Sequence, residues 1–422
     1  MSNISPNTIS INLTKGTFID VFAGCGGLSL GLINAGWAGL FAIEKDDFAF
    51  QTLSNNLINK PDSSFVWPEW LPQTTHCVAS LIDTYTDNLK AMGGQVDLLA
   101  GGPPCQGFSS AGRRVSNDPR NSLMQSYLKL VEIVKPKSVL IENVHGITVD
   151  FSDSSTDSGK LNYSKILIDA LSIEYDVFFR TINVSDFGVP QARNRFFLLA
   201  MRKDLRNEKS ENPFPLLYEG KNTFLKNKGL LSPVSAHTAI SDLEIHRNGR
   251  VVCNDSPNFE AIGYVGPQSS YQKLMREGSV EAPSNTRLAK HKPHIVTRFT
   301  EIIRLCQIEG RLNRSISAQM RELFGLRKLA LRVLDPDAPS PTITSMPDDL
   351  LHYREPRTLT VRENARLQSF PDWYEFYGKY TTGGVLRKKE VPRFTQVANA
   401  VPPLMAEAIG HTLKTWLRIN RT

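Results

Sequence analysis

A cysteine on a stiff turn is the most chemically suggestive feature of this 422-residue sequence. Cys105 stands in the stretch Pro103-Pro104-Cys105-Gln106-Gly107-Phe108, just after an apolar run at residues 96–100 that predicts a buried strand. Prolines fix φ and cannot continue a strand or a helix, so the chain must turn there. Open α/β sheets place their chemistry at the carboxyl ends of such strands. A single loop cysteine more often only packs, so the interpretation of Cys105 as a nucleophile depends on its neighbours.

A carboxylate ends a second predicted strand. Glu142 follows the apolar residues 139–141. Because the tips of parallel strands gather at one edge of a sheet, Glu142 can approach Cys105 although 37 positions separate them. By itself, a glutamate at a strand end is more often a cap or a surface charge.

Two arginines precede a further apolar run at residues 196–201. In Gln191-Ala192-Arg193-Asn194-Arg195, the arginines share one side of an extended chain because side chains alternate. Two guanidiniums on one side suit an anion or a polarised carbonyl oxygen, and they can lower the pKa of a nearby thiol. Without the other motifs, a pair of surface arginines is the simpler interpretation.

A glycine turn joins the first predicted strand to the first predicted helix. The turn is Phe22-Ala23-Gly24-Cys25-Gly26-Gly27, and Glu44 follows Gly24 by twenty residues, at the end of the second strand. A carboxylate there can accept hydrogen bonds from a ribose diol. Ser29 stands where the dinucleotide fingerprint has its third glycine. The pattern therefore suits a cofactor with a ribose but no pyrophosphate, such as S-adenosylmethionine, although a tight turn by itself explains the glycines equally well.

Regular elements must position these residues. Apolar runs that predict strands alternate with helical spacing, which predicts an α/β fold with a doubly wound, mostly parallel sheet. The predicted strands cover residues 17–23, 40–43, 96–100, 139–141, 177–184 and 196–201, and the predicted helices cover 28–35, 48–58, 123–134 and 163–173. We expect a first domain that begins with residues 15–203, a less regular domain over 204–357, and a return segment, 358–422, whose helix at 404–419 completes the first domain.

The positive charge is concentrated. The net charge is +7, and residues 285–332 contain eleven Lys or Arg and three Glu, which gives +8 for this segment and about −1 for the rest. We call residues 285–332 the basic region. A solvated helical face explains it less well than a polyanion partner with phosphate contacts.

Other features of the sequence argue against a secreted protein, a membrane protein and a metalloprotein. The five cysteines form no close pairs, the first residues are not a signal peptide, and no run nears the roughly 20 apolar residues that span a bilayer. No Cys-x-x-Cys or His-Glu-x-x-His spacing points to a metal. We therefore expect a cytoplasmic protein without a metal and without a membrane partner.

Taken together and in this order, the motifs resemble the DNA (cytosine-5)-methyltransferases, in particular the bacterial type II restriction–modification methylases. The resemblance spans nearly the whole chain. It rests on residues 18–27, Gly102-Pro-Pro-Cys-Gln-Gly-Phe-Ser109, Glu142-Asn-Val144, Gln191-Ala-Arg-Asn-Arg195, residues 362–371 and Gln396-Val-Ala-Asn-Ala-Val401.

The resemblance implies a role for each matching position. Cys105 would add to carbon 6 of cytosine, Glu142 would hold or protonate the ring nitrogen, and Arg195 with Arg193 would grip the base carbonyl. The residues implied to contact the substrate are Pro104, Gln106, Ser109 and Arg120, and those implied to surround S-adenosylmethionine are Phe22, Gly24, Gly26, Gly27, Glu44, Leu123 and Asn399.

Further expectations follow from the same resemblance. The domain at 204–357 would read a short double-stranded DNA sequence, the enzyme would act as a monomer on the nucleoid, and it would protect host DNA from a restriction endonuclease. Some positions depart from the family: Lys45 replaces an aromatic residue, the carboxylate that meets the adenine amine is not evident, and Ala398 replaces a glycine before Asn399.

Three alternatives stay open. A tRNA cytosine methyltransferase has the same catalytic set, but the long basic insert argues for duplex DNA. A catalytically silent DNA-binding regulator of this fold is disfavoured by the intact Cys105, Glu142 and Arg195. A nicotinamide dehydrogenase is disfavoured by Ser29 and by the turn at Cys105.

Overall fold

A computed structural model describes residues 15–103, 121–149, 151–152, 160–206, 211–383, 386 and 389–419. Residues 104–120, which include Cys105, lie outside the described residues.

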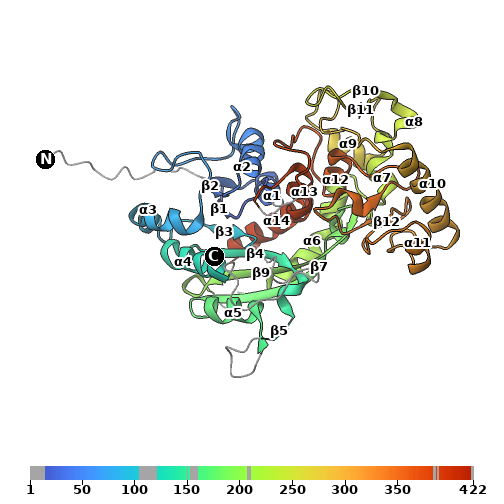
Figure 1. Ribbon diagram of the computed structural model, residues 1–422. Helices are drawn as coiled ribbons and strands as arrows, with labels where there is room; N and C mark the ends of the chain where they lie inside the picture. The colour runs from blue at the N-terminus through green and yellow to red at the C-terminus, as the bar shows by residue number, and fades with distance from the viewer. Residues whose placement is uncertain are drawn as a thin grey trace.

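A six-stranded sheet forms the centre of the molecule, in the order β2-β1-β3-β4-β9-β7 (Figure 1). Each strand from β2 to β4 is parallel to its neighbour, and only β9 is reversed, since it pairs antiparallel with both β4 and β7. The predicted α/β fold with a mostly parallel sheet is therefore confirmed. The strands are β1 (Thr17–Val21), β2 (Ala38–Ile43), β3 (Leu98–Gly101), β4 (Ser138–Val144), β7 (Tyr175–Asn183) and β9 (Asn194–Arg202).

Helices cover both faces of the sheet. Strand side chains alternate between the faces, so Phe18 lies in one hydrophobic core, while Ile19 and Val21 lie in the other. The helices that pack on the Phe18 face are α1 (Gly27–Asn34), α6 (Pro213–Asn227) and α14 (Pro403–Ile419), and those on the opposite face are α3 (Val78–Ala91), α4 (Asn121–Val134) and α5 (Tyr163–Leu171).

Two of these helices were absent from the sequence prediction. The segment that contains α6 is rich in proline, but Pro213 stands at the helix start, where proline is tolerated, and the Asn212 side chain caps the helix by accepting from the Phe214 N–H. In α3, polar residues dominate, and Leu81, Ile82 and Leu89 bury one narrow side. The predicted helix at 48–58 is α2 (Asp47–Leu53) continued by the π-helical turn η1 (Ser54–Ile58).

The return segment packs its last helix beside the first. Helices α12 (Val361–Leu367) and α13 (Arg393–Asn399) precede α14, which lies along α1 (Figure 1). A Cβ at Gly31 would lie 2.4 Å from the Cβ of Ala406, so glycine permits this close helix approach. The last helix therefore completes the helical layer on the Phe18 face of the sheet, which α1 begins after the glycine turn.

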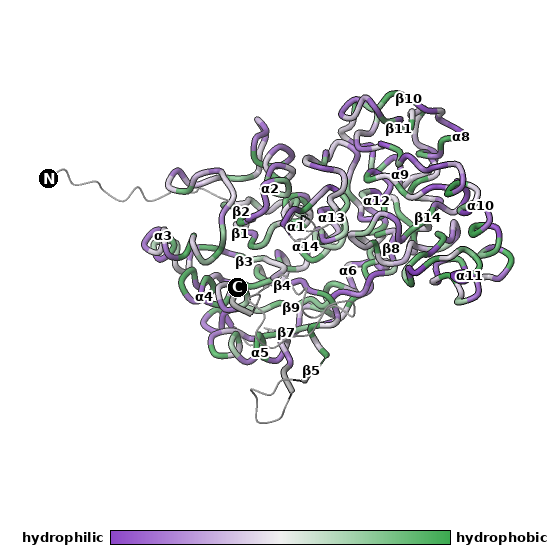
Figure 2. Tube along the Cα trace, in the orientation of Figure 1, coloured by the Kyte–Doolittle hydropathy of each residue, from purple (hydrophilic) through white to green (hydrophobic). Residues whose placement is uncertain are grey.

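The middle of the chain builds smaller elements at one end of the molecule (Figure 1). A separate core joins α10 (Pro293–Ile308), α11 (Ala318–Leu323), β12 (Arg332–Val333) and β14 (Leu350–Leu351). Hydrophilic and hydrophobic residues alternate along α10 and α11, as Figure 2 shows. The remaining elements are α7 (Ala236–Ile240), α8 (Ile245–Asn248), β10 (Arg250–Val252), β11 (Glu260–Ile262) and α9 (Ser270–Arg276).

One short pairing links this part to the sheet. Strand β13 (Ser340–Pro341) runs parallel to β8 (Gln191–Ala192), directly before Arg193. A two-stranded pair of β5 (Phe151–Ser152) and β6 (Lys160–Leu161) follows β4, and β5 lies at the bottom of the view in Figure 1. Among the described helices, none has the length and hydropathy that crossing a bilayer requires.

Candidate active site

Glu142 and Arg195 form a buried ion pair at the carboxyl end of β4. The Nε of Arg195 lies 2.9 Å from the Oε1 of Glu142, and both side chains are about nine-tenths buried. The antiparallel register of β4 and β9 places Val144 opposite Arg195 and Glu142 opposite Phe197. The reversed strand therefore carries Arg195 to the end of β4, which the sequence analysis did not foresee.

Burial sets the protonation of this pair. Desolvation raises the pKa of the Glu142 carboxyl above its ordinary value, and the positive charges of Arg195 and Arg193 only partly oppose this rise. The carboxyl therefore holds a proton to a higher pH than an exposed glutamate does. A protonated carboxyl in this position can donate a hydrogen bond to a ring nitrogen.

The chain that leads to Cys105 passes close to Glu142 at Gly102. A Cβ at Gly102 would lie 3.4 Å from the Oε2 of Glu142, and the amide Nδ2 of Asn143 donates to the carbonyl oxygen of Pro103 at 3.0 Å. The last described residues before Cys105 thus lie at the end of β4. Cys105, Pro104, Gln106, Ser109 and Arg120 themselves lie outside the described residues.

Arg193 lies on the same side of the chain as Arg195 but has a different partner. Both arginine side chains are buried, whereas Ala192 and Asn194 are exposed. The Nη1 of Arg193 donates to the carbonyl oxygen of Ala398 at 2.8 Å. The two arginines thus lie on one side of the chain, where Arg195 contacts Glu142 and Arg193 contacts the Ala398 carbonyl.

The glycine turn is held by the carboxylate of Glu44. The Gly24 N–H donates to Oε2 of Glu44 at 2.9 Å, and the N–H groups of Lys45 and Asp46 donate to Oε1 at 2.9 and 2.8 Å. Gly24 and Gly26 have φ values of 56° and 88°, which glycine adopts without a Cβ clash. An ionised carboxylate offers about four lone-pair positions, so three backbone donors leave room on Oε2 for a hydroxyl.

The other residues that are predicted to contact the donor lie at the start of this turn, on α4 and at the end of α13. The Phe22 ring stacks on Tyr127 of α4, with centroids 6.4 Å apart, and Leu123 is half-buried on the same helix. Asn399 is exposed at the end of α13.

The return segment lies directly against the glycine turn. A Cβ at Gly27 would lie 2.4 Å from the carbonyl oxygen of Val401, and the Tyr374 hydroxyl donates to the carbonyl oxygen of Cys25. Residues 396–401 therefore contact both the glycine turn and Arg193. The glycine turn leaves space for a ligand, and Oε2 of Glu44 can accept one more hydrogen bond. Both features suit a methyl donor that contains a nucleoside.

The sequence analysis assigned no role to two buried glutamines that join these parts. Gln191 begins the motif that contains the arginines, and Gln368 lies just after α12; both are fully buried. The available signals were the first position of Gln-x-Arg-x-Arg for Gln191 and the motif at residues 362–371 for Gln368. Within the part of the chain that the structure describes, no cluster of three His, Cys, Asp or Glu could hold a metal ion.

Comparison with known proteins identifies the family of this chain. The family model for C-5 cytosine-specific DNA methylase matches residues 16–415. The chain is 33% identical to the type II methyltransferase M.DdeI of Desulfomicrobium norvegicum, over 94% of this chain and 88% of that protein. It is 30% identical to the type II methyltransferase M1.HphI of Haemophilus parahaemolyticus, over 94% and 86%.

Solved structures share the fold. A DNA modification methyltransferase encoded within a prophage of E. coli has a TM-score of 0.63 at 23% identity, over 96% of this chain and all of that chain. The S. pombe Dnmt2 methyltransferase has a TM-score of 0.52 at 14% identity, over 96% and 99%. Since the family model covers nearly the whole chain, and M.DdeI exceeds 30% identity over most of its length, the chain belongs to the C-5 cytosine-specific DNA methylases.

Proposed function

We propose that this DNA cytosine-5-methyltransferase transfers a methyl group from S-adenosylmethionine to carbon 5 of one cytosine in a short double-stranded DNA sequence. The observation that carries the proposal is the buried pair of Glu142 and Arg195 at the end of β4, against the start of the Cys105 turn. Pro104, Gln106, Ser109 and Arg120 are the proposed substrate contacts on that turn. Phe22, Gly24, Gly26, Gly27, Glu44, Leu123 and Asn399 are the proposed donor contacts.

The proposed chemistry explains the residue types. Carbon 5 of cytosine is a weak nucleophile, so the Cys105 thiolate adds to carbon 6 while Glu142 donates its proton to the ring nitrogen. The ring then becomes an enamine, and carbon 5 can attack. When bound, S-adenosylmethionine supplies the electrophilic methyl group. A base then removes the carbon 5 proton, the bond to Cys105 breaks, and Glu142 recovers its proton from the ring nitrogen.

The two arginines orient Glu142 and affect its pKa in this scheme. Arg195 holds the Glu142 carboxyl toward the base, with Arg193 held alongside by the Ala398 carbonyl. Their charges oppose the rise in the Glu142 pKa, but burial outweighs them. The acid therefore keeps its proton to a higher pH than an exposed glutamate does, and its contact with Arg195 fixes its orientation.

A cytosine inside a duplex cannot reach this buried edge. The base must leave the stack, which costs a few kcal/mol. We assign the compensating phosphate contacts and the sequence reading to residues 204–357, which contain the basic region. Residues 15–203 and 358–422 are the proposed catalytic domain.

The biological role follows from the type II methyltransferases to which the chain is similar. We propose that methylation protects cytoplasmic host DNA from a matching restriction endonuclease and that the enzyme acts as a monomer. Genomic DNA from cells that express the protein should resist one endonuclease, and bisulfite sequencing should find one methylated motif. Unmodified DNA in such cells would contradict this role.

A trapping experiment tests the mechanism. Duplex DNA with 5-fluorocytosine at the target position should form a covalent adduct with the wild-type protein, because fluorine cannot leave as a proton does. The Cys105→Ala variant should form no adduct and should methylate nothing, yet it should bind the same duplex with nearly wild-type affinity. Methylation by this variant would refute the nucleophile assignment, and methylation of tRNA but not of duplex DNA would refute the substrate.

A further inference from the structure

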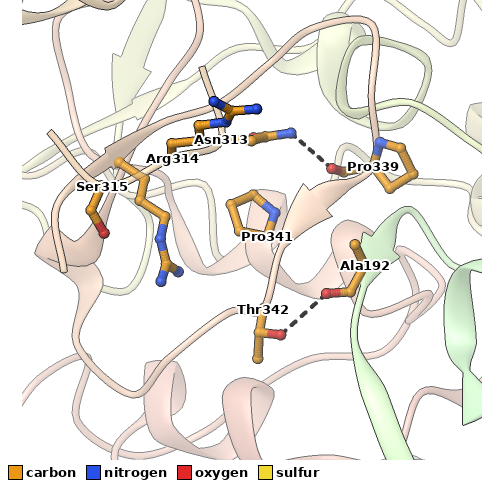
Figure 3. A pocket seen from close by; sticks show the side chains of 8 residues that line it. Ala192, Asn313, Arg314, Ser315, Pro339, Pro341 and Thr342 are labelled. Atoms are coloured by element: carbon orange, nitrogen blue, oxygen red, sulfur yellow. Dashed lines mark hydrogen bonds between the residues drawn. The ribbon is translucent and has the colours of Figure 1, made fainter. Parts of the chain in front are cut away.

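A pocket of about 460 Å³ lies where β8 meets the middle of the chain. Figure 3 shows Asn313, Arg314 and Ser315 on one side of the pocket, with Pro341 and Thr342 beside Ala192. The pocket is lined by Ala192, Asn313, Arg314, Ser315, Arg332, Pro339, Pro341 and Thr342.

Asn313 fixes the corner that presents Arg314. Its φ of 62° is left-handed, its N–H donates to the Val333 carbonyl at 2.7 Å, and its Nδ2 donates to the Pro339 carbonyl at 3.0 Å. An antiparallel bridge pairs Ser315 with Arg332. The two arginines therefore come from neighbouring segments whose backbones are fixed by hydrogen bonds.

The pocket concentrates positive charge without a counter-ion. Elsewhere in the basic region, Arg304 pairs with Glu301, and Lys328 pairs with Asp348 and Asp349. Among the described residues, neither the Arg314 nor the Arg332 guanidinium forms an ion pair or a hydrogen bond, and no acidic residue lines the pocket. Such a cavity suits an anion.

The pocket lies next to the proposed catalytic edge. Ala192 precedes Arg195 by three residues in a nearly extended chain, which spans about 10 Å. The Thr342 hydroxyl donates to the Ala192 carbonyl at 3.2 Å and ties the two walls together. The pocket therefore lies close along the chain to Arg195, the residue that contacts Glu142.

We propose that this pocket binds one backbone phosphate of the DNA substrate through Arg314 and Arg332. The proposal rests on the proposed function, because it takes its ligand from that substrate. Guanidiniums match the planar geometry of phosphate oxygens, and phosphate contacts fix the register of a protein on a duplex. A concave site between two prolines and a threonine admits a protruding phosphate more readily than the recessed edge of a base pair.

The salt dependence of DNA binding tests the proposal. The logarithm of the binding constant falls with the logarithm of salt concentration by about 0.9 for each neutralised phosphate. In the double variant R314Q/R332Q, the magnitude of this slope should be smaller by about 0.9, the value for one phosphate. At low salt the variant should bind duplex DNA at least about 10-fold more weakly. The loss should be the same for duplexes with and without the target sequence.

The matched control is Arg304→Gln, an exposed arginine of the same region that already pairs with Glu301. It should leave the slope unchanged. The single variant Arg314→Gln replaces an exposed side chain, so it keeps the test valid if the half-buried Arg332 proves necessary for folding. It too should weaken binding equally for both duplexes.

Two results would overturn the assignment. One is an unchanged slope in the double variant. The other is relaxed specificity at a single base pair, which would make the arginines readers of a base. Binding is measured without turnover, so the two proposals can fail separately. If the double variant shows the slope loss but the wild-type protein methylates no cytosine, the proposed function is refuted and the phosphate site stands.

Discussion

The side-chain amide of Gln191 donates a hydrogen bond to the Oε1 of Gln368 at 2.9 Å, in the fully buried space between β8 and the return segment. Gln191 also accepts from the Ile343 N–H at 3.1 Å. Gln368 in turn donates to the Val397 carbonyl at 2.8 Å, two residues before Asn399. The pair thus joins three segments: the one that carries the arginines, the one that lines the anion pocket and the one that lies against the donor turn.

We expect Gln368→Met to weaken this junction. Methionine keeps the shape but cannot pair with the buried Gln191 amide or the Val397 carbonyl, and an unpaired buried polar group costs about 1–3 kcal/mol. Urea unfolding should show a loss of that size, and kcat should fall because the Ala398 carbonyl that holds Arg193 shifts. Gln307→Met, at an exposed position on α10, is the control and should change neither quantity. A stable variant with unchanged kcat would show that the pair does not position the site.

Glu142→Gln should remove the proton donor and keep the shape. We expect kcat to fall about 10²- to 10⁴-fold, the range for a positioned acid or base. Because burial raises the pKa of Glu142, wild-type activity should decline as pH rises through that raised pKa and deprotonates the acid. Single-turnover methylation across pH should lose this limb in the variant. A variant that keeps the same alkaline decline would assign it to another group.

Glu44→Ala should weaken donor binding and spare DNA binding. The carboxylate holds the Gly24 N–H and offers its remaining position to a hydroxyl. Loss of charge-assisted hydrogen bonds of about 1.5–3 kcal/mol corresponds to about a 10- to 100-fold higher Kd for S-adenosylmethionine. Calorimetry can measure this, with the exposed Glu69→Ala as control. An unchanged donor Kd would contradict the placement of the donor at this turn.

Asp20→Asn should change the pH dependence of stability. Asp20 is buried in β1, where Oδ2 accepts from the Ser29 hydroxyl at 2.6 Å and Oδ1 has no hydrogen-bond partner among the described residues. Burial raises the pKa of Asp20 from 3.8 to about 7. The folded state therefore keeps a proton that the unfolded chain loses above pH 4. The contribution of Asp20 to stability is thus fully present below pH 4 and falls as pH rises toward 7.

Asparagine cannot ionise, so residue 20 should no longer contribute to the decline of the unfolding free energy with pH. Urea unfolding between pH 4 and 8 should show a decline that is smaller by a few kcal/mol in Asp20→Asn than in wild type. Asp87→Asn, at an almost fully exposed position, should leave the decline as it is. Equal declines in all three proteins would mean that Asp20 is ionised in the folded state.

The sequence by itself determined the class of fold and predicted the candidate site residues. Alternating apolar runs predicted a mostly parallel sheet, and local motifs placed Glu142, Glu44 and the glycine turn at strand ends, because turns and strand tips depend on neighbours in the chain. The helices α3 and α6 escaped prediction, since a narrow apolar side in one and prolines in the other weaken the local signal.

Only the tertiary structure decided which partner each side chain finds. Because β9 is antiparallel to β4, Arg195 lies beside Glu142. Arg193 instead donates to the carbonyl oxygen of Ala398, 205 positions later in the chain. Packing also gave Arg304 of the basic region an acidic partner and placed Arg314 and Arg332 at a pocket that no acidic residue lines. Such contacts depend on strand direction and on the meeting of distant segments, and no local pattern of residues encodes either.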